Sequence, residues 1–277
     1  RRVMQTLKII SCLEYQVEEW LMDALDYNNE ILSFNMKDQL ECAVQENFLE
    51  NAGPVWQFTH DIVKSTIYDL IPKDNRTLLH KTIGENLIRA GEHFPAESTA
   101  IHQIAICQIN KFCKHGHLDK QNRLQFAFHN ATAAKYALTS CNFEEARLSI
   151  DMAIELLEDH HWETHYSLSL ELFEMSASVS CIHGDITKIS SCVDEILTHA
   201  KSIDDSLKAS SFLVKVLAAS SKFQEAITKC LVILENLGEH FQTDDNAPPS
   251  ASVDELSVVI EILLRNNFSC EKFKLLP

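Results

Sequence analysis

WQFTHDIVKSTIYDLIPKDNRTLLHKTIGENLIRAG, at residues 56–91, joins a short predicted strand to two amphipathic helices. Asp61 can cap the first of these helices, because its carboxylate can accept hydrogen bonds from the free N–H groups of a helix start. Pro72 disfavours helical geometry in the residue before it. The helix is therefore predicted to begin near Asp61 and to end near Pro72. Its predicted buried face consists of Val63, Ile67, Leu70 and Ile71.

The second helix of this stretch is predicted to start around Asp74. Arg76 and Lys81 are expected to stay in water, and Gly91 can supply a left-handed stop. A further helix is predicted over residues 97–114. The predicted buried face of the second helix consists of Leu79, Ile83 and Leu87.

The residues before this stretch have the pattern of three short helices and a hairpin. Residues 48–50 and 55–58 indicate two strands around a turn at 51–54. Three helices followed by a hairpin predict a winged-helix-like domain, which together with the helices after it is assigned to residues 1–91. The apolar stripes of the three helices are Leu7, Ile9 and Ile10; Val17, Trp20, Leu21, Ala24 and Leu25; and Met36, Leu40, Ala43 and Val44.

Three later segments share one apolar template with the spacing i, i+4, i+7, i+8, i+11. Its members are Ala146, Ile150, Ala153, Ile154 and Leu157; Ile189, Val193, Ile196, Leu197 and Ala200; and Ala226, Cys230, Ile233, Leu234 and Leu237. Partner helices are predicted at 126–138, 167–180 and 206–219, so each template helix closes an αα hairpin. Such repeats predict a tetratricopeptide-like α-solenoid at residues 92–277. The predicted fold class is mostly all-α.

The turns before the template helices have similar sequences, at residues 140–143, 183–186 and 220–223. Two of them are predicted to carry capping boxes, and Asp185 is predicted to cap the third helix alone. The predicted boxes pair Asn142 with Glu145 and Ser221 with Gln224. A polar loop at 243–250 and a helix at 253–264 are predicted to follow the last hairpin.

Composition and charge narrow the function classes. The chain has 277 residues, and 24 Lys and Arg stand against 40 Asp and Glu, for a formal net charge of −16. This charge argues against a nucleic-acid partner, because phosphate binding needs clustered cations. The nine cysteines lie mostly in apolar helical stripes, which suits a reducing cytosol. No apolar run approaches the length needed to cross a bilayer, so a cytoplasmic protein without a membrane partner is predicted.

Residue patterns for catalysis or metal binding are weak. No two of the six glycines have the Gly-x-x-x-x-Gly-Lys spacing of a phosphate-binding loop. Cys107, Cys113, His115 and His117 are soft ligands that would suit zinc, but their spacing is unlike that of structural sites, and a helix end followed by polar residues is the favoured interpretation. The histidines at 160–165 do not match His-Glu-x-x-His, and this segment is interpreted as an inter-helix loop. The sequence therefore predicts no catalytic residue, no metal site and no cofactor within this chain.

A family resemblance adds to these patterns. Phe58-Thr59-His60-Asp61, then Tyr68-x-Leu70-Ile71-Pro72, Arg76, His80 and Ile83-Gly84, closely resemble the STAND signal-transduction ATPases, and most of all the ATPase regions of multidomain sensor kinases. Those proteins place an AAA-type nucleotide-binding domain before a winged helix and a tetratricopeptide-like array. The resemblance covers nearly the whole chain. Its motif around His60 is fairly specific, whereas the array is generic.

The resemblance implies a role for two residues. In related nucleotide-binding leucine-rich-repeat receptors, a Met-His-Asp motif at this place uses its histidine to hold the ADP phosphate. Carried over, His60 would sense the nucleotide state and Asp61 would cap the helix. ATP or ADP with Mg would then belong to the parent protein. A purely structural His60 at a strand–helix corner is the competing interpretation.

The expected function is that of a non-enzymatic regulatory and interaction fragment, cut from a larger ATPase signalling protein. Its expected partners are an upstream nucleotide-binding domain of the same protein and a protein or peptide on the repeat array, with a kinase output outside the chain. The alternative is a stand-alone tetratricopeptide-like scaffold that binds a peptide or protein without nucleotide coupling. A zinc hydrolase is a third and weaker hypothesis.

Overall fold

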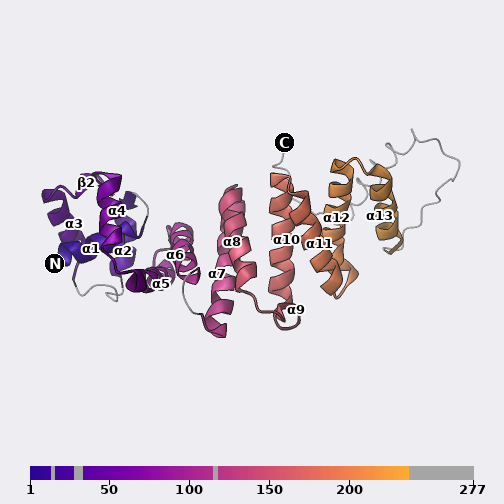
Figure 1. Ribbon diagram of the computed structural model, residues 1–277, viewed down its shortest axis with the longest axis horizontal. Coiled ribbons are helices and arrows are strands. Elements are labelled where there is room, and N and C mark those ends of the chain that lie inside the picture. The colour runs from indigo at the N-terminus through magenta and orange to yellow at the C-terminus, as the bar shows by residue number, and fades with distance from the viewer. Residues whose placement is uncertain (14–15, 28–33, 115–117, 237–277) are drawn as a thin grey trace. The chain divides into compact units, whose positions relative to one another are not determined.

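Helices dominate the computed structural model, which describes residues 1–13, 16–27, 34–114 and 118–236 (Figure 1). The described residues form 13 helices and three short strands, which confirms the mostly α fold class. By contacts the chain divides into two compact units, Arg1–Asp159 and His160–Pro277. The boundary predicted after residue 91 separates two domain types, which the division by contacts does not test, so it stays a prediction.

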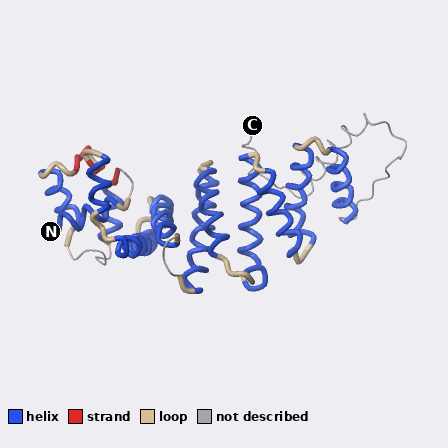
Figure 2. Tube along the Cα trace, in the orientation of Figure 1, coloured by secondary structure: helices blue, strands red, loops and turns tan. Residues whose placement is uncertain are grey.

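The first unit begins with helices around a small sheet, which is red in Figure 2. Its elements are α1 (Arg2–Ser11), β1 (Gln16–Glu18), α2 (Glu19–Asp26), α3 (Met36–Gln45), β2 (Leu49–Ala52), β3 (Val55–Phe58), α4 (Asp61–Asp69), α5 (Lys73–Gly91), α6 (Ser98–Cys113), α7 (Lys120–Thr139) and α8 (Phe143–Leu156). The sheet order is β1-β3-β2, and both pairings are antiparallel. The predicted hairpin is confirmed, and Gly53 takes a positive φ of 71° in its turn.

The strand β1 corrects the predicted second helix. Val17 was expected in a helical stripe, but it pairs with Trp56 in β1, and α2 begins only at Glu19. Val17 is fully buried, so the hydrophobic pattern predicted its burial correctly but wrongly predicted a helix in place of a strand. An apolar side chain at one buried position fits either periodicity, and pairing with β3 decides between them.

One core connects the helices of this region. Leu7, Leu25, Phe58 and Ile83 are each at most 1% exposed and belong to one hydrophobic cluster that extends from α1 into α6. Two predictions nearby are wrong. Leu70 is 54% exposed, not part of the buried face. Gly91 has no positive φ, because α5 ends in a tight turn in which His93 N–H donates to the Ala90 carbonyl at 2.8 Å.

The second unit consists of helices that pack in chain order. Its elements are α9 (His161–Thr164), α10 (Tyr166–His183), α11 (Ile186–His199), α12 (Ile203–Ala219) and α13 (Phe223–Asn236). α10 contacts α11, α11 contacts α12, and α12 contacts α13. The short helix α9 corrects the prediction of a loop at 160–165. Its Trp162 is buried and stacks on Phe173 and His199, with ring centroids at 5.3 and 4.8 Å.

Three αα turns share one backbone geometry, as their sequences predicted. Cys141, Gly184 and Ser221 occupy the same turn position, with φ of 57°, 70° and 59°. The next residue in each turn donates its N–H to a carbonyl in the last turn of the preceding helix. These bonds are Asn142 to Ala137 at 2.8 Å, Asp185 to Ser180 at 2.9 Å and Lys222 to Leu217 at 2.9 Å. The hairpins α7–α8, α10–α11 and α12–α13 are therefore local structural repeats.

The apolar template is correct at its first two positions in all three helices. These residues are Ala146 and Ile150, Ile189 and Val193, and Ala226 and Cys230, each at most 3% exposed. Later positions diverge between the helices. Ala153 and Ile196 are buried at i+7, whereas Leu234 is buried at i+8 and Leu197 is 40% exposed.

The capping predictions have mixed outcomes. Asp185 accepts from the Lys188 N–H at 3.0 Å, as expected. Asn142 accepts from the Glu145 N–H, but the Glu145 carboxylate bonds the Asn142 side-chain amide, not its backbone N–H. The predicted box at Ser221 is wrong, because Ser221 takes the left-handed turn position and Lys222 directly precedes α13.

The left-handed turn position predicts opposite effects for opposite substitutions. Cys141→Gly should raise the free energy of unfolding by about 1 kcal/mol, because glycine adopts positive φ without a Cβ clash. Gly184→Ala should lower it by about the same amount, although no atom lies within 4 Å of the added Cβ. Urea denaturation followed by circular dichroism measures both changes. Changes of the same sign would contradict this origin.

Several predictions lie outside the described residues. These are the last template position at Leu237, the polar loop at 243–250 and the helix at 253–264.

Candidate functional site

His60 and Asp61 lie at the junction of β3 and α4, and both are exposed. His60 is the N-cap residue of α4, with extended φ and ψ of −150° and 145°. Its carbonyl accepts from the N–H groups of Val63 and Lys64 at 3.0 and 3.3 Å. The predicted capping role of Asp61 is therefore wrong. Asp61 is the first helical residue, where its carboxylate interacts favourably with the helix dipole.

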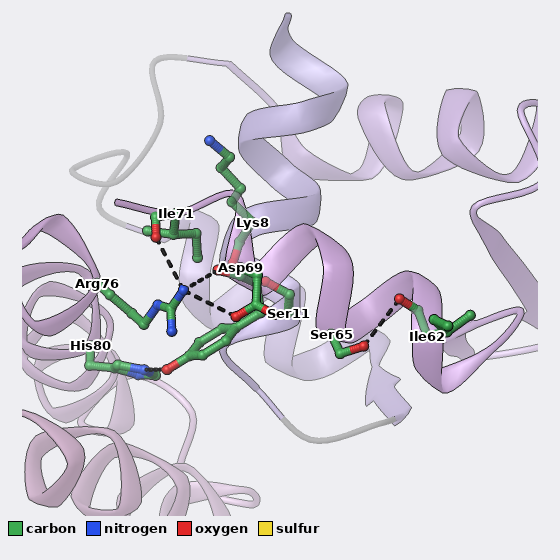
Figure 3. A network of polar contacts seen from close by, with 9 residues as sticks. Lys8, Ser11, Ile62, Ser65, Asp69, Ile71, Arg76 and His80 are labelled. Carbon is green, nitrogen blue, oxygen red and sulfur yellow. Dashed lines mark hydrogen bonds and ion pairs between the residues drawn. The ribbon is translucent and has the colours of Figure 1, made fainter. Parts of the chain in front are cut away.

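The structure gathers three other residues of the motif into a polar joint, formed by Tyr68, Arg76 and His80 where α4 meets α5. The Arg76 guanidinium points at the end of α4 (Figure 3). It donates to the carbonyls of Tyr68 and Ile71 at 3.1 and 3.2 Å, and to the Asp69 carboxylate at 3.3 Å. Its Cζ atom also lies 4.2 Å from the centroid of the Tyr68 ring.

Arg76 thus corrects another prediction. Its side chain is 21% exposed and was expected in water. Carbonyls at the end of a helix lack partners within that helix, and a guanidinium has five donors with which to satisfy them. Arg76, which belongs to α5, therefore satisfies carbonyl groups at the C-terminal end of α4.

His80 links α4 to α6 through two hydrogen bonds. Its Nδ1 lies 2.6 Å from Oε1 of Gln108, and its Nε2 lies 2.9 Å from the Tyr68 hydroxyl. An amide oxygen can only accept, so Nδ1 carries the proton and Nε2 of the neutral ring accepts from Tyr68. Burial lowers the pKa of His80, and the cations of Lys111 and Arg76 lower it further, against the opposing Gln108 bond. A neutral ring fits these bonds, in which the Tyr68 hydroxyl donates to His80 and His80 donates to Gln108.

Two lysines hold the end of α1 beside the joint. Lys64 of α4 donates to the Leu13 carbonyl at 2.7 Å, and Lys111 of α6 donates to the Cys12 carbonyl at 3.3 Å. Burial raises the pKa of the Cys12 thiol to about 12, although Lys111, Arg76 and Lys64 oppose the shift. This thiol is therefore not a nucleophile at neutral pH.

Stability of the first unit is expected to fall in mild acid. A histidine whose pKa is lowered by folding stays neutral while the unfolded chain takes a proton, so its contribution is complete above pH 6.5 and is lost as pH falls from there toward the folded pKa. One such group changes the free energy of unfolding by at most about 1.4 kcal/mol per pH unit. The pKa values of His102 and His129 are also lowered, mainly by burial.

Urea denaturation at pH 7.5 and pH 5.5 measures this dependence. The loss of stability between the two pH values should be smaller in His80→Gln than in the wild type, whatever the absolute stability of the variant. His102→Gln removes a different half-buried imidazole and should also reduce the loss. Equal losses in all three proteins would contradict the assignment.

Sequence reasoning missed Gln108 and the two lysines. Gln108 is 1% exposed and follows Ile101 by seven positions, so it occupies a place that an apolar residue would normally take in the α6 stripe. A polar residue within an apolar stripe signals a buried partner, and this signal was present in the sequence. Lys64 and Lys111 carry no such signal, because lysine at a helix surface is ordinary.

No group of three or more His, Cys, Asp or Glu side chains among the described residues could hold a metal ion. His115 and His117 of the zinc hypothesis lie outside the described residues. Cys113 lines a small pocket with Lys114, Arg123 and Glu155, and burial raises its pKa to about 11. None of these residues belongs to the polar joint.

Comparisons with models of protein families, with curated proteins and with solved structures found no match. Among the described helices, none is both long enough and apolar enough to cross a membrane.

Proposed function

We propose that this chain is a regulatory and protein-interaction part of a STAND-type ATPase signalling protein. In this proposal, residues 1–91 contain a winged-helix-like domain, and the helical hairpins form a tetratricopeptide-like array. The array binds a protein or peptide, and the winged helix passes the effect to a nucleotide-binding domain and a kinase output outside this chain. ATP or ADP with Mg would bind that domain.

The arrangement of the first elements supports the winged-helix-like part. A strand lies between the first two helices, a third helix follows, and the last two strands form a hairpin, in the order α1-β1-α2-α3-β2-β3. The three left-handed αα turns support the repeat array, because one local geometry recurs at each hairpin. These features support the two proposed domain types. The proposed role of the chain depends on the site at His60.

The exposure of His60 at the start of α4 is the observation that carries the proposal. An exposed imidazole can donate to a phosphate oxygen of a nucleotide held by a docked domain. Beside it, Ile62 is 72% exposed, and Leu70 at the other end of α4 is 54% exposed. An exposed hydrogen-bonding side chain next to exposed apolar residues suits a surface that binds another domain and then releases it. A structural His60 would instead be expected to pack at the corner.

Coupling follows if ADP contacts His60 in the closed state and not in the open state. A ligand shifts such an equilibrium only through a difference in its contacts with the two states. The Asp61 carboxylate occupies the first turn of α4 and repels an anion there. The nucleotide contact is therefore assigned to the imidazole, not to the helix start.

ADP retention tests the proposal in the protein expressed from the complete open reading frame. His60→Ala should weaken ADP binding about tenfold, because it removes one hydrogen bond to a charged group. Less ADP should therefore co-purify with the variant. ADP released on denaturation is measured by chromatography. His183→Ala, which removes an exposed histidine at the α10–α11 turn, is the control. Equal ADP content in His60→Ala and the wild type would exclude the sensor role.

A peptide-binding scaffold without nucleotide coupling is the second candidate function. It is favoured by exposed apolar residues on the hairpin helices, namely Phe128, Leu148, Ile182, Ile203 and Val232. The reading frame upstream of residue 1 distinguishes the two. A Walker-type loop there supports nucleotide coupling, and its absence supports the scaffold.

A further inference from the structure

The helix α4 is held by few apolar contacts. All nine of its residues are described, and Ile67 is the one that is buried, while Val63 and Tyr68 pack against the core more loosely. Ser65 and Thr66 turn their hydroxyls back to the Ile62 carbonyl, at 3.1 and 2.6 Å, and do not reach another element through these bonds. The direction of α4 therefore depends strongly on polar contacts.

Those polar contacts act at two points along α4. Near its start, Lys64 bonds the end of α1. In its last turn, Tyr68 bonds His80 while Arg76 holds the Tyr68 carbonyl. Behind His80 stands Gln108, and both side chains are at most 3% exposed. Hydrogen bonds have a narrow range of length, so the series Tyr68–His80–Gln108 fixes the distance between the last turn of α4 and the α5–α6 hairpin.

His60 lies at the opposite end of the same short helix. The distance from His60 to Tyr68 along the axis is about 12 Å at the usual helical rise. A tilt of about 10° at Tyr68 would therefore move His60 by about 2 Å. Good N–H···O bonds span a range of only about 0.5 Å, so such a tilt would break a contact between His60 and a phosphate.

We propose that Tyr68, supported by His80 and Gln108, is a positioning residue that aims α4 and so places His60 against the nucleotide. The inference rests on the proposed function and adds residues to its site. These residues do not touch the nucleotide. They act through the direction of α4.

A double-mutant cycle between Tyr68→Phe and His60→Ala tests this role in the full-length protein. The probe is a methylanthraniloyl derivative of ADP, and its dissociation rate is measured by displacement with excess ADP. Tyr68→Phe removes one oxygen, so the fold should persist, and thermal unfolding verifies this. We expect dissociation to become about tenfold faster in Tyr68→Phe when His60 is present, matching the loss of one charge-assisted hydrogen bond. In the His60→Ala background, Tyr68→Phe should add nothing.

Gln108→Met removes the acceptor behind His80 and should act in the same direction as Tyr68→Phe. Tyr136→Phe deletes a phenol hydroxyl from α7, where the ring contacts His102, and serves as the matched control with an unchanged rate. An equal acceleration by Tyr68→Phe with and without His60 would reveal a general structural effect and overturn the proposal. No acceleration by Tyr68→Phe, while His60→Ala accelerates release, would overturn the positioning role and leave the proposed function intact. No effect of His60→Ala would overturn both.

Discussion

Ile150→Ala should lower the free energy of unfolding by about 2–5 kcal/mol. Ile150 is 1% exposed and lies on α8 between Ala146 and Ala153, which are both fully buried. Small residues on either side bring α8 close to α7, so neighbouring atoms cannot easily collapse into the space that a shortened side chain leaves. The loss therefore combines the transfer of three carbon atoms with an unfilled cavity.

Leu148→Ala is the matched control for this prediction. Leu148 is on the same helix and has the same number of carbon atoms, but it is 54% exposed. Its removal should change the free energy of unfolding by about 0.5 kcal/mol or less. Urea midpoints of the two variants and the wild type, followed by circular dichroism, provide the comparison. Similar losses in both variants would show that the repeat register is wrong.

The apolar template of the hairpin helices shows what could be predicted from the sequence. Ile150 and Val193 are buried at the second template position because helical periodicity alone places them on the inner face. The similar sequences of the three turns predicted a shared geometry, but the left-handed conformation of Cys141, Gly184 and Ser221 was not predicted.

Several failures share a physical cause, which is contact between different elements, whereas the wrong predictions at Asp61, Gly91 and Ser221 concern local turns and helix starts. Val17 is in a strand because β3, far along the chain, pairs with it. Arg76 is half-buried because the end of α4 offers it carbonyl groups. Asn110 and Asn130 form reciprocal side-chain amide bonds of 2.8 and 2.9 Å between α6 and α7. Neither propensity nor periodicity contains such pairings, since each needs both partners in place.

The candidate site also has one part that was predictable from the sequence and one part that was not. The junction that bears His60 was found from the order of a strand, a motif and a helix, which is local. Its supports at His80 and Gln108 depend on the packing of α4 against α5 and of α5 against α6. The sequence motif contains His80 but assigns it no role. Its role in the joint emerges only when the fold buries it between two polar partners.

Close packing of α5 on α6 gives the second large expected effect. Gly84→Ala should lower the free energy of unfolding by about 1–3 kcal/mol through overpacking. A Cβ atom at Gly84 would lie 2.6 Å from Cγ1 of Ile109 and 2.9 Å from the Ala105 carbonyl oxygen. The carbonyl belongs to the backbone of α6, so the two helices must separate to admit the methyl group. This loss outweighs the gain of up to about 1 kcal/mol in helix propensity.

Gly91→Ala, the same change on the same helix, isolates the cause. A Cβ atom there would meet Cγ2 of Ile101 at 3.5 Å, which is an ordinary contact, and Gly91 has no positive φ to strain. The variant should therefore be as stable as the wild type or slightly more stable, by up to about 1 kcal/mol. Parallel urea titrations of both variants measure the difference. A Gly84→Ala protein as stable as Gly91→Ala would mean that α5 and α6 do not approach this closely, and that the hairpin behind His80 and Gln108 is looser than the joint requires.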